Sequence, residues 1–250
     1  DADADADADA DEAGKGQSLY VGNLSYRTDE NRLREIFEMF NCNCSKHVAP
    51  TVHSAVDECL YPMRNKSEHK NYNPDKPAKY GLLIQSYNSV DFPLTHSMIV
   101  SIGKPKSGDG PYYIPKVFDK VRTLIENTER YVKLQGRNIS MDRYYTSIQL
   151  AEWLLDKKKI TMLGTLQKNR QGLPKEVVSL DGRETHSYEV FYEEERGIME
   201  LHSYAVINKS KGKKNVMLLS TNQPIKGITK GHKKKLPAAI QLYNYTKGRH

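Results

Sequence analysis

The sequence predicts an α/β protein with a mixed β-sheet, because apolar strand-like runs alternate with amphipathic helices after an initial pair of neighbouring strands. The neighbouring runs are 79–88 and 96–104, and the later ones are 138–141 and 159–166. After Pro174 the pattern changes to three runs of alternating polar and apolar residues, separated by short turns. These three runs predict an antiparallel meander joined to the mixed sheet.

Two helices are expected between these strands. In 117–132, six residues fall at helical spacing on one face: Val117, Val121, Leu124, Ile125, Thr128 and Val132. Pro115 precedes this helix, a favoured place for proline, and Gly136 follows its end. A second helix is expected to start at a capping-box pair, Thr146 with Gln149, and to run to about Asp156.

The charge of the chain is unevenly distributed. The 250 residues hold 38 Lys and Arg against 31 Asp and Glu, a net charge of +7. Seven of the acids lie in the first twelve residues, which hold no base, so the remainder carries 24 acids and a net charge of +14. A body this basic suggests a polyanionic partner. The Asp-Ala repeat has little to bury and repels itself, so we expect a disordered acidic tail.

Composition also excludes some classes of protein. No apolar run approaches the ~20 residues of a membrane span, and no signal peptide opens the chain. The three cysteines, Cys42, Cys44 and Cys59, lack metal-type spacing to later Cys or His pairs and are expected to be free thiols of an intracellular protein. We expect no membrane partner and no small-molecule substrate.

Four segments follow along the chain. We expect an acidic tail at 1–17, a strand-helix unit at 18–41, a segment preceding the core at 42–79, and an α/β core at 80–250. The core is expected to carry a β-rich insertion at about 175–235.

The stretch "SLYVGNL" at 18–24, followed by a helix expected to start at Thr28, resembles the first strand and helix of an RNA-recognition motif. In that family, Tyr20 would occupy the position whose ring stacks on a base. The second signature of the family does not follow downstream, and 24 residues are too few for an independent core. RNA is therefore an alternative partner, acting through a partial motif.

Asp142, in "NISMDRYYTS", follows a buried strand and precedes a helix. Ligands and catalytic groups of α/β folds gather at this end of a strand. Two-metal phosphoryl transfer uses carboxylates, because Mg²⁺ requires hard oxygen ligands. An aspartate here can equally be a helix cap.

The stretch beginning "SMDRYYTSIQLAEWLL" resembles the central block of piggyBac transposases. Further matches in family order are "VDECLYPMR" (56–64), "PDKPAKYGLLI" (74–84), "YYIPK" (112–116) and "LYNYTKG" (242–248), so that the resemblance covers about 50–250. It implies a ribonuclease-H-like core with a β-rich insertion, acting on DNA with Mg²⁺ held by three aspartates.

In this resemblance Asp142 matches the second aspartate. The first is expected at the end of the strand beginning "KYGLLI", where Asn88 and Ser89 stand, with Asp91 a few places late. The third is expected after "YTKG" and two more residues, directly beyond His250. With one of three ligands matched, we expect weak Mg²⁺ binding and no DNA cleavage, which leaves enzymatic activity uncertain.

Three basic runs complete the candidate sites for nucleic acid. They contribute Lys157, Lys158 and Lys159; Lys211, Lys213 and Lys214; and Lys233, Lys234 and Lys235. Each run can be a solvated turn, and together they predict weak, non-specific DNA binding. The run at 230–235 also predicts nuclear import. A non-enzymatic scaffold that reuses the transposase fold is the remaining alternative.

Overall fold

One mixed β-sheet organises the protein, as the sequence predicts. The computed structural model describes residues 30–64, 69–101, 114–195, 197–208, 212–222 and 236–247. Within these residues the sheet has nine strands, in the order β2-β3-β1-β5-β6-β9-β8-β7, with β4 paired to β3. The strands are β1 (His53–Pro62), β2 (Asn71–Tyr72), β3 (Tyr80–Ser89), β4 (Thr95–Ser101), β5 (Asn138–Met141), β6 (Thr161–Thr165), β7 (Tyr188–Tyr192), β8 (Glu200–Asn208) and β9 (Gly212–Ser220).

The centre of the sheet is formed by β1, β5 and β6. Strand β1 runs antiparallel to β3 and parallel to β5, and β5 runs parallel to β6. The segment 42–79, expected to precede the core, therefore supplies a central strand, β1, as well as the edge strand β2. Every residue of β5 is buried, as expected for a strand covered on both faces.

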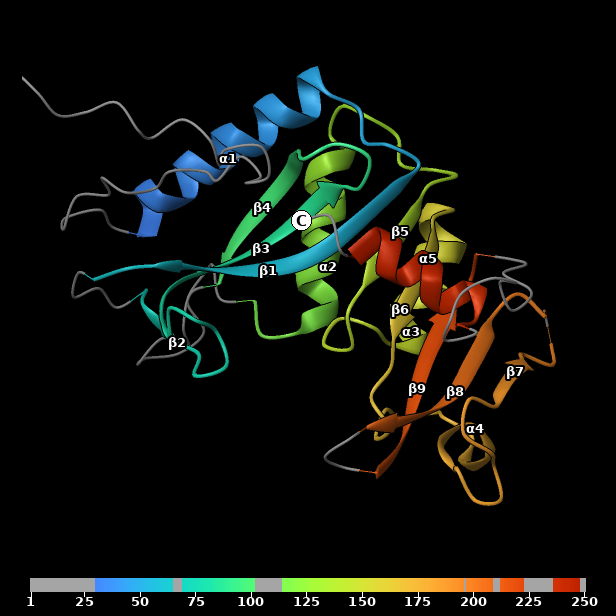
Figure 1. The fold of residues 1–250 in the computed structure, drawn as a ribbon. Coiled ribbons are helices and arrows are strands. Elements are labelled where there is room, and N and C mark those ends of the chain that lie inside the picture. Colours follow the sequence, from blue (N-terminus) through green and yellow to red (C-terminus); the bar gives the residue numbers. More distant parts are fainter. Residues whose placement is uncertain are drawn as a thin grey trace, which may run out of the picture.

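Helices cover both faces of the sheet (Figure 1). On one face, α2 (Val117–Glu129) and α3 (Ile148–Trp153) bury Leu124 and Leu150 against β5 residues Ile139 and Met141. On the other face, α5 (Ala238–Lys247) packs on β1, β5 and β6. The α3 helix continues as η1 (Leu154–Lys158), and a short helix, α4 (Lys175–Val178), packs on β8 and β9. None of the described helices is long and apolar enough to cross a membrane.

Helix α1 (Glu30–His47) belongs to this sheet. Its Leu33 and Phe37 pack with Ile84 of β3, and its Asn41 side chain bonds both the N–H and the C=O of Met98 on β4 (2.7 and 2.8 Å). The helix thus covers the outer edge of the sheet, where unpaired backbone groups need partners. The expected boundary at 41/42 falls inside α1. The face of α1 that an RNA-recognition sheet would cover is already buried, while the expected strand at 18–24 lies outside the described residues.

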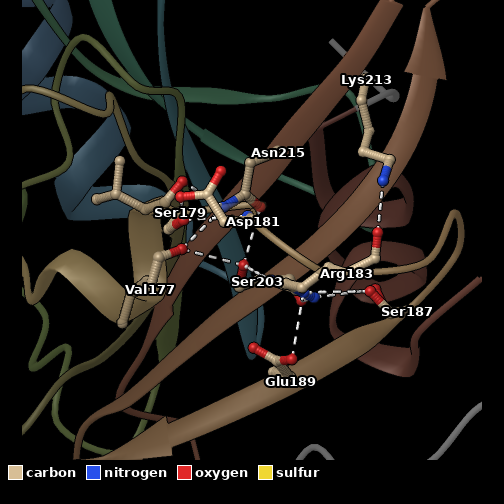
Figure 2. Close-up of polar contacts among 10 residues, drawn as sticks. Val177, Ser179, Asp181, Arg183, Ser187, Glu189, Ser203, Lys213 and Asn215 are labelled. Atoms are coloured by element: carbon tan, nitrogen blue, oxygen red, sulfur yellow. Dashed lines mark hydrogen bonds and ion pairs between the residues drawn. The ribbon is translucent and has the colours of Figure 1, made fainter.

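The meander β7-β8-β9 extends the same sheet through the antiparallel pairing of β9 with β6. The Arg183 side chain, which is mostly buried, joins the loop between α4 and β7 to this meander by hydrogen bonds (Figure 2). Its guanidinium donates to the Ser187 Oγ and carbonyl oxygen, and to the Ser203 Oγ and carbonyl oxygen, at 2.5–3.1 Å. Ser203 and Asn215 in turn donate to the carbonyl oxygen of Val177 in α4. The antiparallel insertion expected from the sequence is confirmed.

The start of α3 differs by one residue from the expected capping box. Ser147 is the N-cap, and its Oγ accepts a hydrogen bond from the Leu150 N–H at 3.2 Å. Thr146 instead donates its hydroxyl to the carbonyl oxygen of Asp142 at 2.8 Å. The helix starts later because Thr146 is used to fix the turn that carries Asp142.

Candidate metal-binding site

Asp142 is held at the carboxyl end of β5 by a compact turn. Its Oδ1 accepts a hydrogen bond from the Tyr144 N–H at 2.8 Å. Its carbonyl oxygen accepts bonds from the N–H groups of Tyr145 and Thr146, at 3.2 and 3.1 Å, in addition to the Thr146 hydroxyl. The backbone around the carboxylate is therefore fixed, which is what a metal ligand needs.

Asp57 lies next to Asp142 across the sheet. The parallel ladder between β1 and β5 pairs Val56 with Met141, and the two aspartates directly follow that pair. Adjacent strands are about 4.8 Å apart, and paired residues point to the same face. The two carboxylates are therefore neighbours on one face of the sheet.

The alternation of side chains along β1 identifies this face. Val56 packs in the core with α2, and Glu58 accepts a hydrogen bond from the buried Tyr145 hydroxyl at 3.1 Å on that same face. Asp57 stands between them and points to the opposite face, which is the one that α5 covers. Burial, followed by the Glu58 carboxylate, raises the pKa of Tyr145 far above its ordinary value.

Helix α5 ends in a lysine whose charge interacts with the two aspartates. The Thr246 and Ser140 hydroxyls are hydrogen-bonded at 2.7 Å, which anchors the end of the helix to β5 beside Asp142. Burial lowers the pKa of the adjacent Lys247, but the Tyr243 hydroxyl and the carboxylates of Asp142 and Asp57 outweigh it, so that the net pKa is raised. The field of the two carboxylates thus favours a positive charge at this place.

The residues expected at the first ligand position lie elsewhere. Asn88 and Ser89 are on β3, beyond β1, so they are two strands and about 10 Å from β5. The Asn88 amide bonds Ser86 and Thr95, and the Ser89 hydroxyl bonds His96 at 2.7 Å. The register instead places Asp57 beside Asp142, and the expectation for Asn88 and Ser89 stays a prediction.

Asp57 was missed although the sequence contains a signal for it. It is the acid in "VDECLYPMR", directly after a short apolar run, at the end of a strand-like segment. The strand beginning "KYGLLI" was preferred because its apolar run is longer. Strand β1 precedes β3 in the chain but lies between β3 and β5 in the sheet, and only the pairing reveals this.

Arg170 is a further basic group beside Asp142. Its guanidinium donates to the carbonyl oxygens of Arg143 and Tyr144, at 2.9 and 2.7 Å, in the turn that follows Asp142. Tyr144 is 40% exposed in this turn, whereas Tyr145 is buried. Arg170 thus adds positive charge at the rim of the site. Of the two tyrosine rings, only that of Tyr144 is accessible to solvent.

The predicted lysines do not gather at this site. Lys157, Lys158 and Lys159 follow α3 at the start of β6, the edge of the sheet opposite Asp142. Lys158 bonds Glu129 at 2.5 Å and lies over the Trp153 ring, so it is engaged inside the protein. Lys213 and Lys214 are exposed at the start of β9. The remaining predicted residues lie outside the described ranges: Tyr20, Lys211, Lys233, Lys234 and Lys235.

The oxygen-only donor set suits a hard divalent cation such as Mg²⁺. Two carboxylates come together here, and among the described residues no group of three or more His, Cys, Asp and Glu side chains converges in this way. A cation held here would have two carboxylate ligands from the described residues, and water or phosphate oxygens would complete its shell.

Gly164 offers a test of how the Asp142 turn is held. A Cβ at Gly164 would collide with the Thr146 Oγ1 and approach the Met141 carbonyl oxygen to 3.0 Å. We expect Gly164→Ala to lower the free energy of unfolding by about 1–3 kcal/mol in urea denaturation. Removing the obstructing side chain should relieve part of this, so Gly164→Ala combined with Thr146→Ala should cost less than the sum of the single changes. Strict additivity would contradict the contact.

Comparisons with known proteins agree with this geometry. The sequence matches the transposase IS4 family over residues 22–250. The structure is similar to a chain in the cryo-EM structure of the piggyBac transposase synaptic complex with hairpin DNA, with a TM-score of 0.71 and 26% sequence identity. The match covers 87% of this chain and 42% of that one, so the chain spans less than half the length of this relative. No curated protein sequence matches.

Proposed function

The chain belongs to the transposase IS4 family, and on that premise we propose that its piggyBac-like domain binds DNA and holds a divalent metal ion, Mg²⁺ in the cell, between Asp57 and Asp142. The observation that carries the proposal is the register that puts these two carboxylates side by side on adjacent central strands. When bound there, a divalent cation neutralises charge on a phosphate oxygen and activates an attacking oxygen.

The proposal assigns a role to each group near the Asp57–Asp142 pair. Asp57 and Asp142 supply the oxygen ligands, and the turn at 142–146 orients the second of them. Arg170 adds positive charge beside the turn, where a DNA phosphate would approach. The positive charge of Lys247 offsets part of the repulsion between the two carboxylates when no metal is bound.

The inactivity expected from the sequence rested in part on a missing first aspartate. In this proposal Asp57 takes that position, and the reaction class proposed for the site is metal-dependent DNA cleavage and strand transfer. Cleavage of a hairpin or nicked duplex with Mg²⁺ or Mn²⁺, compared between the wild type and Asp57→Asn, tests this activity. Equal products from both proteins would contradict a catalytic role for the pair.

DNA binding is tested by a fluorescence titration with labelled duplexes of two unrelated sequences. We expect both duplexes to bind equally, with affinity falling at least about tenfold between about 50 and 200 mM salt, because phosphate contacts release counterions. Lys157→Gln with Lys159→Gln should reduce the salt slope by about two, if both exposed lysines contact phosphates. Absence of salt-dependent binding by the wild type would instead favour the scaffold alternative.

A further inference from the structure

Two exposed tyrosines form a ring pair where the edge strand β2 meets the start of β3. Tyr72 and Tyr80 are directly paired between β2 and β3, with their ring centroids 4.7 Å apart. They are 60% and 52% exposed, although tyrosine normally buries most of its ring. The pair therefore offers accessible aromatic surface on a hydrogen-bonded strand pair.

The surroundings of the pair are basic. The Lys70 Nζ lies 5.3 Å from the centre of the Tyr80 ring. Lys79 and Arg64 are exposed nearby in the chain, while Lys76 is paired with Glu58 at 3.8 Å. Asp75 is the one acid in residues 69–80. Aromatic faces next to free cations are the combination that proteins use to hold unpaired bases of a nucleic-acid strand.

The pair also lies in line with the candidate metal site. In the β1–β3 ladder Asp57 is opposite Ser86, which is six residues from Tyr80 along β3. Six residues span about 20 Å, and the even spacing puts the Tyr80, Ser86 and Asp57 side chains on one face of the sheet. On this face Leu82 and Ile84 of β3 are covered by α1, so the accessible line between the tyrosines and Asp57 runs along β1, where Cys59 is exposed.

We propose that Tyr72 and Tyr80 form a stacking platform for an unpaired base of single-stranded DNA, with Lys70 on the adjoining phosphate. The platform holds a DNA strand whose other part reaches the Asp57–Asp142 pair, so this inference rests on the proposed function. Stacking is tolerant of base identity because every base has a π-face, and the platform therefore contributes affinity without sequence preference.

The test compares an oligothymidylate of about 12 nucleotides with an abasic oligonucleotide of the same length. We expect the wild-type protein to bind the oligothymidylate about ten- to a hundredfold more tightly, since the phosphates are the same and only the bases differ. Tyr72→Ala with Tyr80→Ala should remove that difference and leave duplex binding unchanged. Tyr72→Phe with Tyr80→Phe should keep it, because the rings remain.

Tyr192→Ala is the matched control, since Tyr192 is 51% exposed on β7, away from β2 and β3. Equal wild-type affinity for the two oligonucleotides would overturn the platform without needing any variant to fold. An unchanged preference in the Ala pair, an equal loss in Tyr192→Ala, or a stronger preference for the matching RNA oligonucleotide would also overturn it. Failure of the proposed function is distinct, because it appears as absent salt-dependent binding of duplex DNA by the wild type.

Discussion

Asp57→Asn and Asp142→Asn should each abolish the stabilisation of the domain by Mn²⁺ or Mg²⁺. At a metal concentration a hundred times the dissociation constant, a ligand that binds only the folded state adds about 2.7 kcal/mol to its stability. Each carboxylate supplies a negatively charged oxygen that a neutral amide replaces poorly at a hard cation. Calorimetric titration with Mn²⁺ and thermal unfolding with and without the metal both measure this loss.

Asp91→Asn is the matched control for these variants. Asp91 is an exposed carboxylate after β3, close in sequence to Asn88 and Ser89, and its Oδ1 accepts a bond from the Tyr245 hydroxyl at 3.4 Å. It lies outside the ladder that pairs β1 with β5, so its replacement should leave metal binding unchanged. A loss in Asp91→Asn equal to that in Asp57→Asn would mean that the metal site is at the end of β3 after all.

Arg183→Met should lower the free energy of unfolding by about 3 kcal/mol, the largest stability effect expected of any change considered for the insertion. The side chain is 8% exposed and donates to two carbonyl oxygens and two hydroxyls that have little access to water. Methionine has a similar length but no donor, so all four hydrogen bonds would be lost, although the Ser187 carbonyl oxygen keeps the Ala205 N–H and the Ser203 hydroxyl keeps its bond to Val177. The Glu189 contact adds little, because that carboxylate is 44% exposed.

Arg122→Met is the control for the arginine substitution. Arg122 is 46% exposed on α2 and makes ion pairs only with Asp119 and Glu126, one helical turn away on either side. Its replacement should change stability by less than about 0.5 kcal/mol. Urea denaturation of both variants gives the comparison. Equal effects would show that the Arg183 network does not hold the loop to β8 and β9.

Local sequence patterns were sufficient for most elements of the sheet. The run 138–141 predicts β5 with its observed ends, because four buried residues between Arg137 and Asp142 leave little choice of boundary. The helical spacing of Val121, Leu124 and Ile125 predicts α2, since this face has to be buried. The polar-apolar alternation after Pro174 predicts β7, β8 and β9 in the same way.

Local sequence patterns did not predict the order of the strands in the sheet. Strand β1 contains the sequence "VDECLYP", in which the acids interrupt the apolar run, so it does not read as a central strand. Its place between β3 and β5 depends on pairings with residues 19 to 35 positions away in β3 and 85 positions away in β5. Asp57 could be assigned to the site only once those pairings were known.

Local patterns also did not predict where the other candidate site residues lie in the fold. Tyr144 and Tyr145 are adjacent in the chain, yet one is exposed and the other is in the core, because the turn after β5 points them in different directions. Lys157 and Lys158 lie in η1, and Lys213 and Lys214 lie in β9, so the position of these lysines relative to Asp142 is decided by the sheet. Lys247 and Arg170 carry no pattern of their own and are brought to the site by α5 and by the segment after β6.

The central claim is that Asp57 and Asp142 share a cation, and anomalous diffraction from a crystal of this domain soaked in Mn²⁺ tests it most directly. We predict one anomalous peak on the α5 face of the sheet, bound by a carboxylate oxygen of each residue at about 2.1 Å. A peak bound by only one of the two aspartates, or located at Asn88 and Asp91 instead, would contradict the account.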